Sequence, residues 1–340
     1  MSKAKESLWK KVSTDLKVEI ERGLFNKSKF PTLREICIQY EVSGITARRV
    51  IAELAAQGLI KKSTKTGSSV IKRDRMVKEI FLIGPANNNQ SIIYSQINQG
   101  IIEEAAKNNI EIKTVSSDFI LNNLNTIKEL NLIAPASEGV LFEKLKDQAL
   151  WKIVKYHSIT KDKTFSTVRS DLKNAAVIAM KYLLGQGHKR IAFITGKSGY
   201  WFVSRLEAYT KTLHENDIDL DLRLIKGVEK DSYEETASAV KSLMELSAPP
   251  TAIFAATDIH ALNILSFCRN SGIKVPEKLA LCGFDNLPES EFYSPPLTTV
   301  DTNWKTQGAE AVRLFRNEDF LNGKIIDVKI KPELVVRQSS

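Results

Sequence analysis

Residues 30–60, FPTLREICIQYEVSGITARRVIAELAAQGLI, decide the fold of the first part of the chain. Thr32 followed by Glu35 is a capping box, which predicts a helix from residue 33 to about residue 40. The Ser-Gly pair after that helix predicts a tight turn and a further helix over 45–57, which ends at the next glycine. Two short helices joined by a tight turn are typical of a helix-turn-helix unit.

The flanking segments complete a larger module, which we place at residues 1–72. Apolar residues spaced by four over 8–22 predict an amphipathic first helix. Short β-like runs at 59–62 and 69–72 lie on either side of a polar Thr-Gly pair and predict a β-hairpin. Three helices followed by a hairpin are the plan of a winged helix-turn-helix domain.

The third predicted helix has one apolar face, and its opposite face carries basic and small side chains. A helix of this kind fits the major groove of DNA, where arginine pairs with guanine, and lysines on the hairpin would follow the backbone. The residues predicted to contact DNA are Arg34, Ser43, Gly44, Ile45, Thr46, Arg48, Arg49, Lys62, Lys65, Thr66 and Gly67. The alternative interpretation is a three-helix bundle whose basic side chains are only solvated.

Charge is distributed unevenly along the chain. Residues 1–75 contain 17 Lys and Arg against 8 Asp and Glu, whereas residues 76–340 contain 32 of each. The net charge of +9 therefore lies in residues 1–75, which are the N-terminal module and the start of the linker. A basic module on a neutral body indicates that the module meets a polyanion while the body has another task. A basic surface that only aids solubility is the alternative.

The N-terminal module resembles the DNA-binding domain of the GntR family. The matching stretches are FPTLREI at 30–36, VSGITARRV at 42–50, ELAAQGLI at 53–60, and Gly67. The resemblance implies that DNA is read by Arg34, by Ser43 to Thr46 and Arg48 at the start of the third helix, and by Gly67 of the wing. The family commonly has arginine directly after the serine, and Gly44 in that place indicates a different operator.

Beyond a short charged linker at 73–78, strand-like and helical patterns alternate over 79–340. This alternation predicts parallel sheets covered by helices, and the length suffices for two lobes. Strands are expected at 79–84, 110–115, 190–195, 223–225, 252–256 and 279–283, and helices at 91–108, 118–130, 174–184, 204–215, 233–246 and 260–271. The fold class is thus a two-lobe α/β body with an N-terminal winged helix-turn-helix domain.

Polar and aromatic side chains follow several of these strands. Ligands of open α/β sheets bind at the carboxyl ends of strands. Carboxylates and arginine bind hydroxyl groups there, and aromatic rings stack on a sugar ring. The predicted effector contacts are Tyr94, Trp201, Phe202, Arg205, Thr257, Asp258 and Asp285. For each of them alone, an ordinary loop residue is the alternative.

The body resembles the effector-binding domain of the LacI family, a two-lobed periplasmic-binding-protein fold. The matching stretches are GHKRIAFITG at 187–196, RLEAY at 205–209, PTAIFAATD at 250–258, GFDN at 283–286 and PPLTTV at 295–300. The resemblance implies effector contacts at Arg205, at an Asn-Asp pair and at Asp285. Thr257 replaces the asparagine of that pair. The joined head and body are similar to arabinose-responsive bacterial repressors, which points to a sugar.

Enzyme and metal chemistry have little support in the sequence. Gly196-Lys197-Ser198 lacks the first P-loop glycine, because that position is Ile191. The four histidines share no ligand spacing, the three cysteines are scattered, and no nucleophile elbow is present. Asp258 and Asp285 could be a glycosidase pair, but hydrolysis does not explain the basic module. We expect no enzyme activity, no cofactor and no metal.

These observations predict a ligand-responsive transcriptional regulator of the repressor type. It would bind double-stranded operator DNA as a homodimer and respond to a small effector, a sugar or a sugar derivative. The N-terminus has no apolar signal region and no stretch is apolar enough to span a membrane, so we expect a cytoplasmic protein without a membrane partner. A solute-binding protein and a DNA-binding protein without a ligand are the alternatives.

Overall fold

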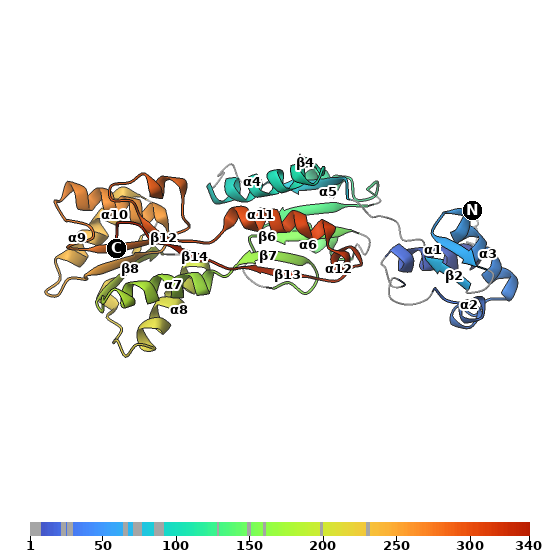
Figure 1. The fold of residues 1–340 in the computed structure, drawn as a ribbon, viewed down its shortest axis with the longest axis horizontal. Helices are drawn as coiled ribbons and strands as arrows, with labels where there is room; N and C mark the ends of the chain where they lie inside the picture. The colour runs from blue at the N-terminus through green and yellow to red at the C-terminus, as the bar shows by residue number, and fades with distance from the viewer. Residues whose placement is uncertain are drawn as a thin grey trace.

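The structure of the protein is a computed structural model. It describes residues 8–21, 25, 30–63, 67–70, 77–84, 92–127, 129–147, 151–158, 161–197, 200–228 and 232–340. They form a small head and a body of two α/β lobes (Figure 1). Most of the predicted linker and the tip of the predicted hairpin lie outside the described residues.

The head contains three helices and a two-stranded antiparallel hairpin, in the order predicted from the sequence. Its elements are α1 (Leu8–Glu21), α2 (Leu33–Gln39), α3 (Gly44–Ala56), β1 (Ile60–Ser63) and β2 (Gly67–Val70). Helix α2 begins at the predicted capping box, in which the Thr32 and Glu35 side chains each accept the other's backbone N–H. Apolar side chains from all three helices and β1 form the core.

The first lobe, called the N-lobe, is a six-stranded parallel sheet with helices on both faces. The strand order is β13-β7-β6-β5-β3-β4. The strands are β3 (Glu79–Ile83), β4 (Glu111–Val115), β5 (Asn131–Pro135), β6 (Lys152–Tyr156), β7 (Ser166–Ser170) and β13 (Asp327–Ile330). The helices are α4 (Ile92–Lys107), α5 (Ser117–Asn122), α6 (Gly139–Leu145), α11 (Trp304–Arg313), η3 (Leu314–Arg316) and α12 (Glu318–Leu321).

The helix predicted over 118–130 is wrong in length, because α5 ends at Asn122. Asn123 follows, and its side chain donates to the carbonyl of Phe119 while its own carbonyl accepts from the Thr126 hydroxyl. Such local side-chain bonds give the backbone an alternative to further helical turns. The chain therefore leaves the helix early and enters β5.

The second lobe, called the C-lobe, is a six-stranded sheet in the order β14-β12-β11-β10-β8-β9. Only β14 is antiparallel to its neighbour. The strands are β8 (Ile191–Gly196), β9 (Ile225–Val228), β10 (Ala252–Ala255), β11 (Ala280–Phe284), β12 (Thr298–Asp301) and β14 (Glu333–Val335). The helices are α7 (Leu172–Gly185), α8 (Tyr200–His214), η1 (Leu222–Leu224), α9 (Tyr233–Met244), α10 (Asp258–Asn270) and η2 (Pro288–Glu291).

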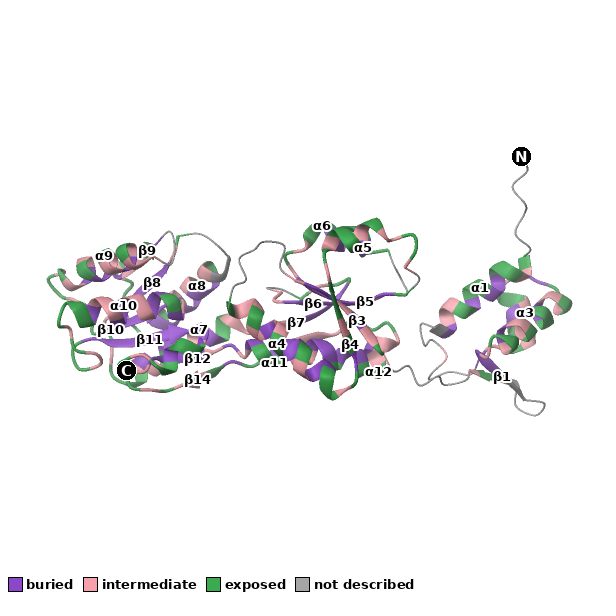
Figure 2. Ribbon diagram, turned by 90° about the horizontal axis from the view of Figure 1, so that it is seen from above, coloured by how far each residue is buried: buried purple, intermediate pink, exposed green. Residues whose placement is uncertain are grey.

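The chain passes between the two lobes three times. It crosses between β7 and α7, between β12 and α11, and between β13 and β14. The centre of each sheet is buried (Figure 2), as expected for parallel strands covered on both faces. Each lobe therefore has its own core, and the two are joined by three short segments.

None of the described helices combines the length and the apolar character that a membrane span requires.

Candidate functional site

The head presents one face of α3 to solvent. Ala47, Val50 and Leu54 are fully buried, whereas the Ile45 side chain on the opposite face is 81% exposed. Arg48 and Arg49 are exposed on the same side as Ile45, and Arg34 is exposed on α2. The predicted apolar and solvent-facing sides of this helix are thus found as expected.

The polar residues at the start of α3 are partly engaged in the helix itself. The Ser43 hydroxyl caps α3 by accepting the backbone N–H of Thr46, and the two hydroxyl oxygens are 3.0 Å apart. A Cβ built on Gly44 meets nothing within 4 Å, so packing does not require glycine there. The Arg49 guanidinium lies 4.2 Å from the ring centroid of Trp9 in α1. Ser43 and Arg49 therefore have structural roles in addition to any contact with DNA.

The remaining predicted DNA contacts are described only in part. Gly67 begins β2. Lys65, Thr66 and the side chain of Lys62 lie outside the described part of the structure.

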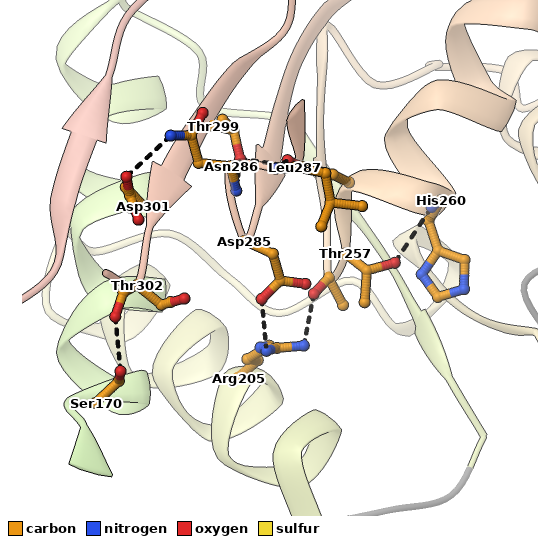
Figure 3. A network of polar contacts seen from close by, with 12 residues as sticks. Ser170, Arg205, Thr257, His260, Asp285, Asn286, Leu287, Thr299, Asp301 and Thr302 are labelled. Carbon is orange, nitrogen blue, oxygen red and sulfur yellow. Dashed lines mark hydrogen bonds and ion pairs between the residues drawn. The ribbon is translucent and has the colours of Figure 1, made fainter. Parts of the chain in front are cut away.

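In the C-lobe, Arg205 of α8 is buried at the carboxyl ends of the strands (Figure 3). Its Nη1 donates to the carbonyl of Ala256 at 2.6 Å, and its Nη2 is 3.7 Å from Asp285 Oδ1. The guanidinium also lies 3.8 Å from the ring centroid of Phe284. Burial lowers the pKa of Arg205, an effect opposed by the charges of Asp285 and Asp258. Arginine remains protonated, so the site holds a buried ion pair.

The turn after β11 brings Asp285 to Arg205. Asp285 and Asn286 have φ values of +111° and +53°, which few residues other than glycine adopt. Thr257 lies nearby as the N-cap of α10, where its hydroxyl oxygen accepts the backbone N–H of His260 at 3.2 Å. Left-handed backbone at two successive residues is stored strain of the kind found at binding sites.

The Asp258 side chain, a predicted effector contact, is engaged by the protein itself. Its side chain is fully buried, and both carboxylate oxygens accept hydrogen bonds from the protein. The donors are the Leu287 N–H at 2.8 Å, the Ser290 hydroxyl at 2.7 Å and the Thr299 hydroxyl at 2.5 Å. Burial raises the pKa of Asp258 to about 6 in spite of these bonds. Asp258 therefore ties the start of α10 to the segments after β11 and in β12.

Helix α8 carries both of the aromatic residues that the sequence predicts as effector contacts beside Arg205. Phe202 is half-buried, and its ring covers Gly196, where an added Cβ would lie 2.4 Å from it. Its centroid is 5.9 Å from the Arg205 guanidinium. The side chain of Trp201 lies outside the described part of the structure.

The N-lobe contributes a column of three stacked rings. His157 comes directly after β6, and its ring lies between those of Trp304 and Tyr94. The ring centroids are 5.0 Å apart for Trp304, with an interplanar angle of 6°, and 5.3 Å apart for Tyr94, with an interplanar angle of 21°. Burial, and then the positive charge of Arg205 across the lobes, lower the pKa of His157 to about 4. Tyr94 was predicted, whereas His157 and Trp304 were missed because neither lies in a pattern that marks a site. We call Tyr94, His157, Trp304, Arg205 and Asp285 the interlobe site.

Several buried polar atoms around this site have no hydrogen-bond partner among the described residues. They are Arg205 Nε, Thr195 Oγ1 at the end of β8, Thr302 Oγ1 and Trp304 Nε1. A buried donor or acceptor left unsatisfied costs about 1–3 kcal/mol. These atoms lie toward the carboxyl ends of the strands, the edge at which open α/β sheets bind ligands.

No group of three or more potential metal-ligating side chains occurs within the described residues.

Residues 180–340 match the family model of the periplasmic binding protein-like domain. A LacI-family regulatory protein from Chloroflexus aggregans superposes with a TM-score of 0.66 at 21% identity, over 77% of this chain and 98% of that one. The body has the periplasmic-binding-protein-like fold. This result confirms the two-lobed α/β body that was predicted from the sequence.

The similar curated proteins are transcription regulators. The transcriptional repressor CytR of Escherichia coli K12 is 37% identical over 153 residues, which is 45% of each protein. Catabolite control protein A of Priestia megaterium is 28% identical over 305 residues, 84% of each. The match thus spans about half the length of CytR and most of the length of catabolite control protein A. These relatives are regulators and not enzymes, as the sequence predicted, but they do not support the GntR assignment of the head.

Proposed function

We propose that the protein is a ligand-responsive transcriptional repressor that binds operator DNA as a homodimer. The observation that carries the proposal is the set of unsatisfied buried polar atoms around Arg205 in a periplasmic-binding-protein-like body. The exposed face of α3 on a basic head supports DNA binding. The relatives named as repressors support the same function.

The composition of the interlobe site favours an uncharged, hydroxyl-rich effector such as a sugar. Arg205 and Asp285 carry opposite charges and cancel each other, and the lowered pKa of His157 keeps its ring neutral near pH 7. An anionic ligand would therefore meet no net positive charge. Hydroxyl groups both donate and accept, which suits the mixture of unsatisfied donors and hydroxyls around the site.

Ligand binding would act on DNA through the three crossings between the lobes. A ligand held by both lobes stabilises one relative orientation of them, and in a dimer that orientation sets the spacing of the two heads. A coupling free energy of about 1–3 kcal/mol would change operator affinity by roughly 5- to 150-fold.

A panel of sugars and nucleosides tests this function on the full chain. Isothermal calorimetry should find a compound that binds the wild-type protein, and the same compound should change its affinity for operator DNA obtained by selection from random sequences. Arg205→Lys keeps the buried positive charge but loses the forked donors, so it should weaken ligand binding while DNA binding is retained. A panel without any binding compound would favour a DNA-binding protein that has no ligand.

We further propose that the head is a GntR-type winged helix-turn-helix domain. The family motifs and the order of three helices and a hairpin support it. Gly44→Arg restores the family's arginine at a position with open space, so we expect a folded protein with tighter DNA binding. Unchanged DNA affinity of Gly44→Arg would argue against this docking of α3.

A further inference from the structure

The three crossings between the lobes are joined to one another by hydrogen bonds. The Ser170 hydroxyl donates to the Thr302 carbonyl at 2.6 Å and links the first crossing to the second (Figure 3). The Asn303 side chain donates to the Lys331 carbonyl at 2.9 Å and links the second to the third. The Asp171 N–H donates to the Ile330 carbonyl at 3.1 Å and closes the triangle.

Gln307 connects this triangle to the interlobe site. Its side chain is fully buried in α11. Its Oε1 accepts the backbone N–H of His157 at 2.7 Å, and its Nε2 donates to the Ser170 hydroxyl at 3.1 Å. The Ser170 oxygen thus accepts from Gln307 and donates to Thr302, so one continuous chain of hydrogen bonds runs from the end of β6 to two crossings.

The first turn of α11 holds His157 in two ways. Trp304 stacks on its imidazole, and Gln307, three residues later on the same helix face, binds its backbone. Helix α11 is itself fixed against α4, because a Cβ at Gly308 would lie 2.0 Å from the carbonyl oxygen of Ile97. The N-lobe end of this hydrogen-bond chain therefore lies on a closely packed pair of helices, and its other end lies at the crossings.

We propose that Gln307 is a positioning residue that fixes the relative orientation of the lobes and couples the interlobe site to the crossings. Displacement of His157 would pull on the Gln307 amide and weaken its bond to Ser170. Buried hydrogen bonds are directional and costly to leave unmade, so the lobes would then rotate to another fully bonded arrangement. This inference rests on the proposed ligand-driven rotation, but its central prediction concerns the protein without ligand.

The distance between the lobes in the ligand-free full chain tests the proposal. Spin labels on cysteines introduced at the exposed positions Lys144 in α6 and Ser238 in α9 report it by pulsed electron resonance. Cys37→Ala removes the partly exposed native thiol, whereas Cys268 and Cys282 are buried. Gln307→Leu should broaden or shift the distance distribution, because it removes both bonds while nearly keeping the volume.

Two further variants make the experiment decisive. Ser170→Ala breaks the same chain with a smaller change, so it should have the same effect even where Gln307→Leu fails to fold, and the double variant should add little. Thr212→Val removes a fully buried hydroxyl bond to the Ala208 carbonyl, far from the crossings, and should leave the distances unchanged. Wild-type distances in Gln307→Leu and Ser170→Ala, or an equal effect of Thr212→Val, would overturn the proposal. Neither result depends on whether an effector is found.

Discussion

At the scale of single residues, Arg48 and Arg49 are neighbours in the sequence but lie in different surroundings. Both are exposed on the outer side of α3, yet only Arg49 has its guanidinium over the Trp9 ring. A cation over an aromatic ring contributes about 0.5–1 kcal/mol at an exposed site. Helical periodicity placed both residues on the correct face, but could not show that one of them packs on another helix.

This difference predicts unequal effects of two alanine substitutions. Arg48→Ala should weaken operator binding by about ten- to a hundredfold and leave stability near wild type, as expected for loss of a groove contact. Arg49→Ala should also lower the free energy of unfolding by about 0.5–1 kcal/mol, since it removes the contact with Trp9. Fluorescence anisotropy with labelled DNA and urea denaturation measure the two quantities. Unchanged DNA affinity in both variants would contradict the assignment of α3 as the reading helix.

The buried ring of His157 predicts a pH dependence of stability. Its pKa is lowered from 6.5 to about 4, so the unfolded chain takes up a proton at a higher pH than the folded protein does. Its contribution is therefore complete above pH 6.5 and is lost as the pH falls toward 4, by up to roughly 3 kcal/mol. His157→Phe should reduce this loss in urea denaturation series between pH 7 and 4. Trp304→Phe keeps the histidine and is the control; an identical slope in His157→Phe and wild type would refute the assignment.

At the scale of elements, the body shows where sequence patterns fail. Strand β7 was not predicted, because its sequence STVRS has no apolar run. The strand is nevertheless largely buried. Its polar side chains are satisfied there, because the Thr167 hydroxyl and the Arg169 guanidinium both donate to Asp327 of the neighbouring β13. That partner lies 160 residues away, so no local pattern reveals it. The strands rich in isoleucine and phenylalanine, such as β8 and β10, were predicted nearly to the residue.

Local sequence patterns could not predict that helices α4 and α11 pack against each other. The two helices approach each other through two glycines. A Cβ added at Gly100 would lie 1.9 Å from the carbonyl oxygen of Lys305. A Cβ added at Gly308 would lie 2.0 Å from the carbonyl oxygen of Ile97. Gly308→Ala should therefore destabilise the protein by about 1–3 kcal/mol or more, because backbone must move. Gly185→Ala in α7 meets nothing within 4 Å and should be neutral or stabilising by about 0.5–1 kcal/mol. Thermal melts compare the two; equal stability would contradict the close packing of α4 on α11.

At the scale of the whole molecule, charge and binding chemistry occupy separate parts. The net charge of +9 lies in residues 1–75, while the body is neutral overall and pairs its buried Arg205 with Asp285. Under the proposed function, this separation draws DNA to the head and leaves the body to hold a neutral ligand. The logarithm of operator affinity should consequently fall linearly with the logarithm of salt concentration, with a slope of about −0.9 for each phosphate neutralised.

The affinity of the effector for the interlobe site should hardly change over the same range of salt concentration, since the site carries no net charge to be screened. Titrations by anisotropy and calorimetry from low to high salt measure both. DNA affinity that does not depend on salt concentration would refute the electrostatic role of the head. Effector affinity that falls steeply with salt concentration would refute the proposal of a neutral effector.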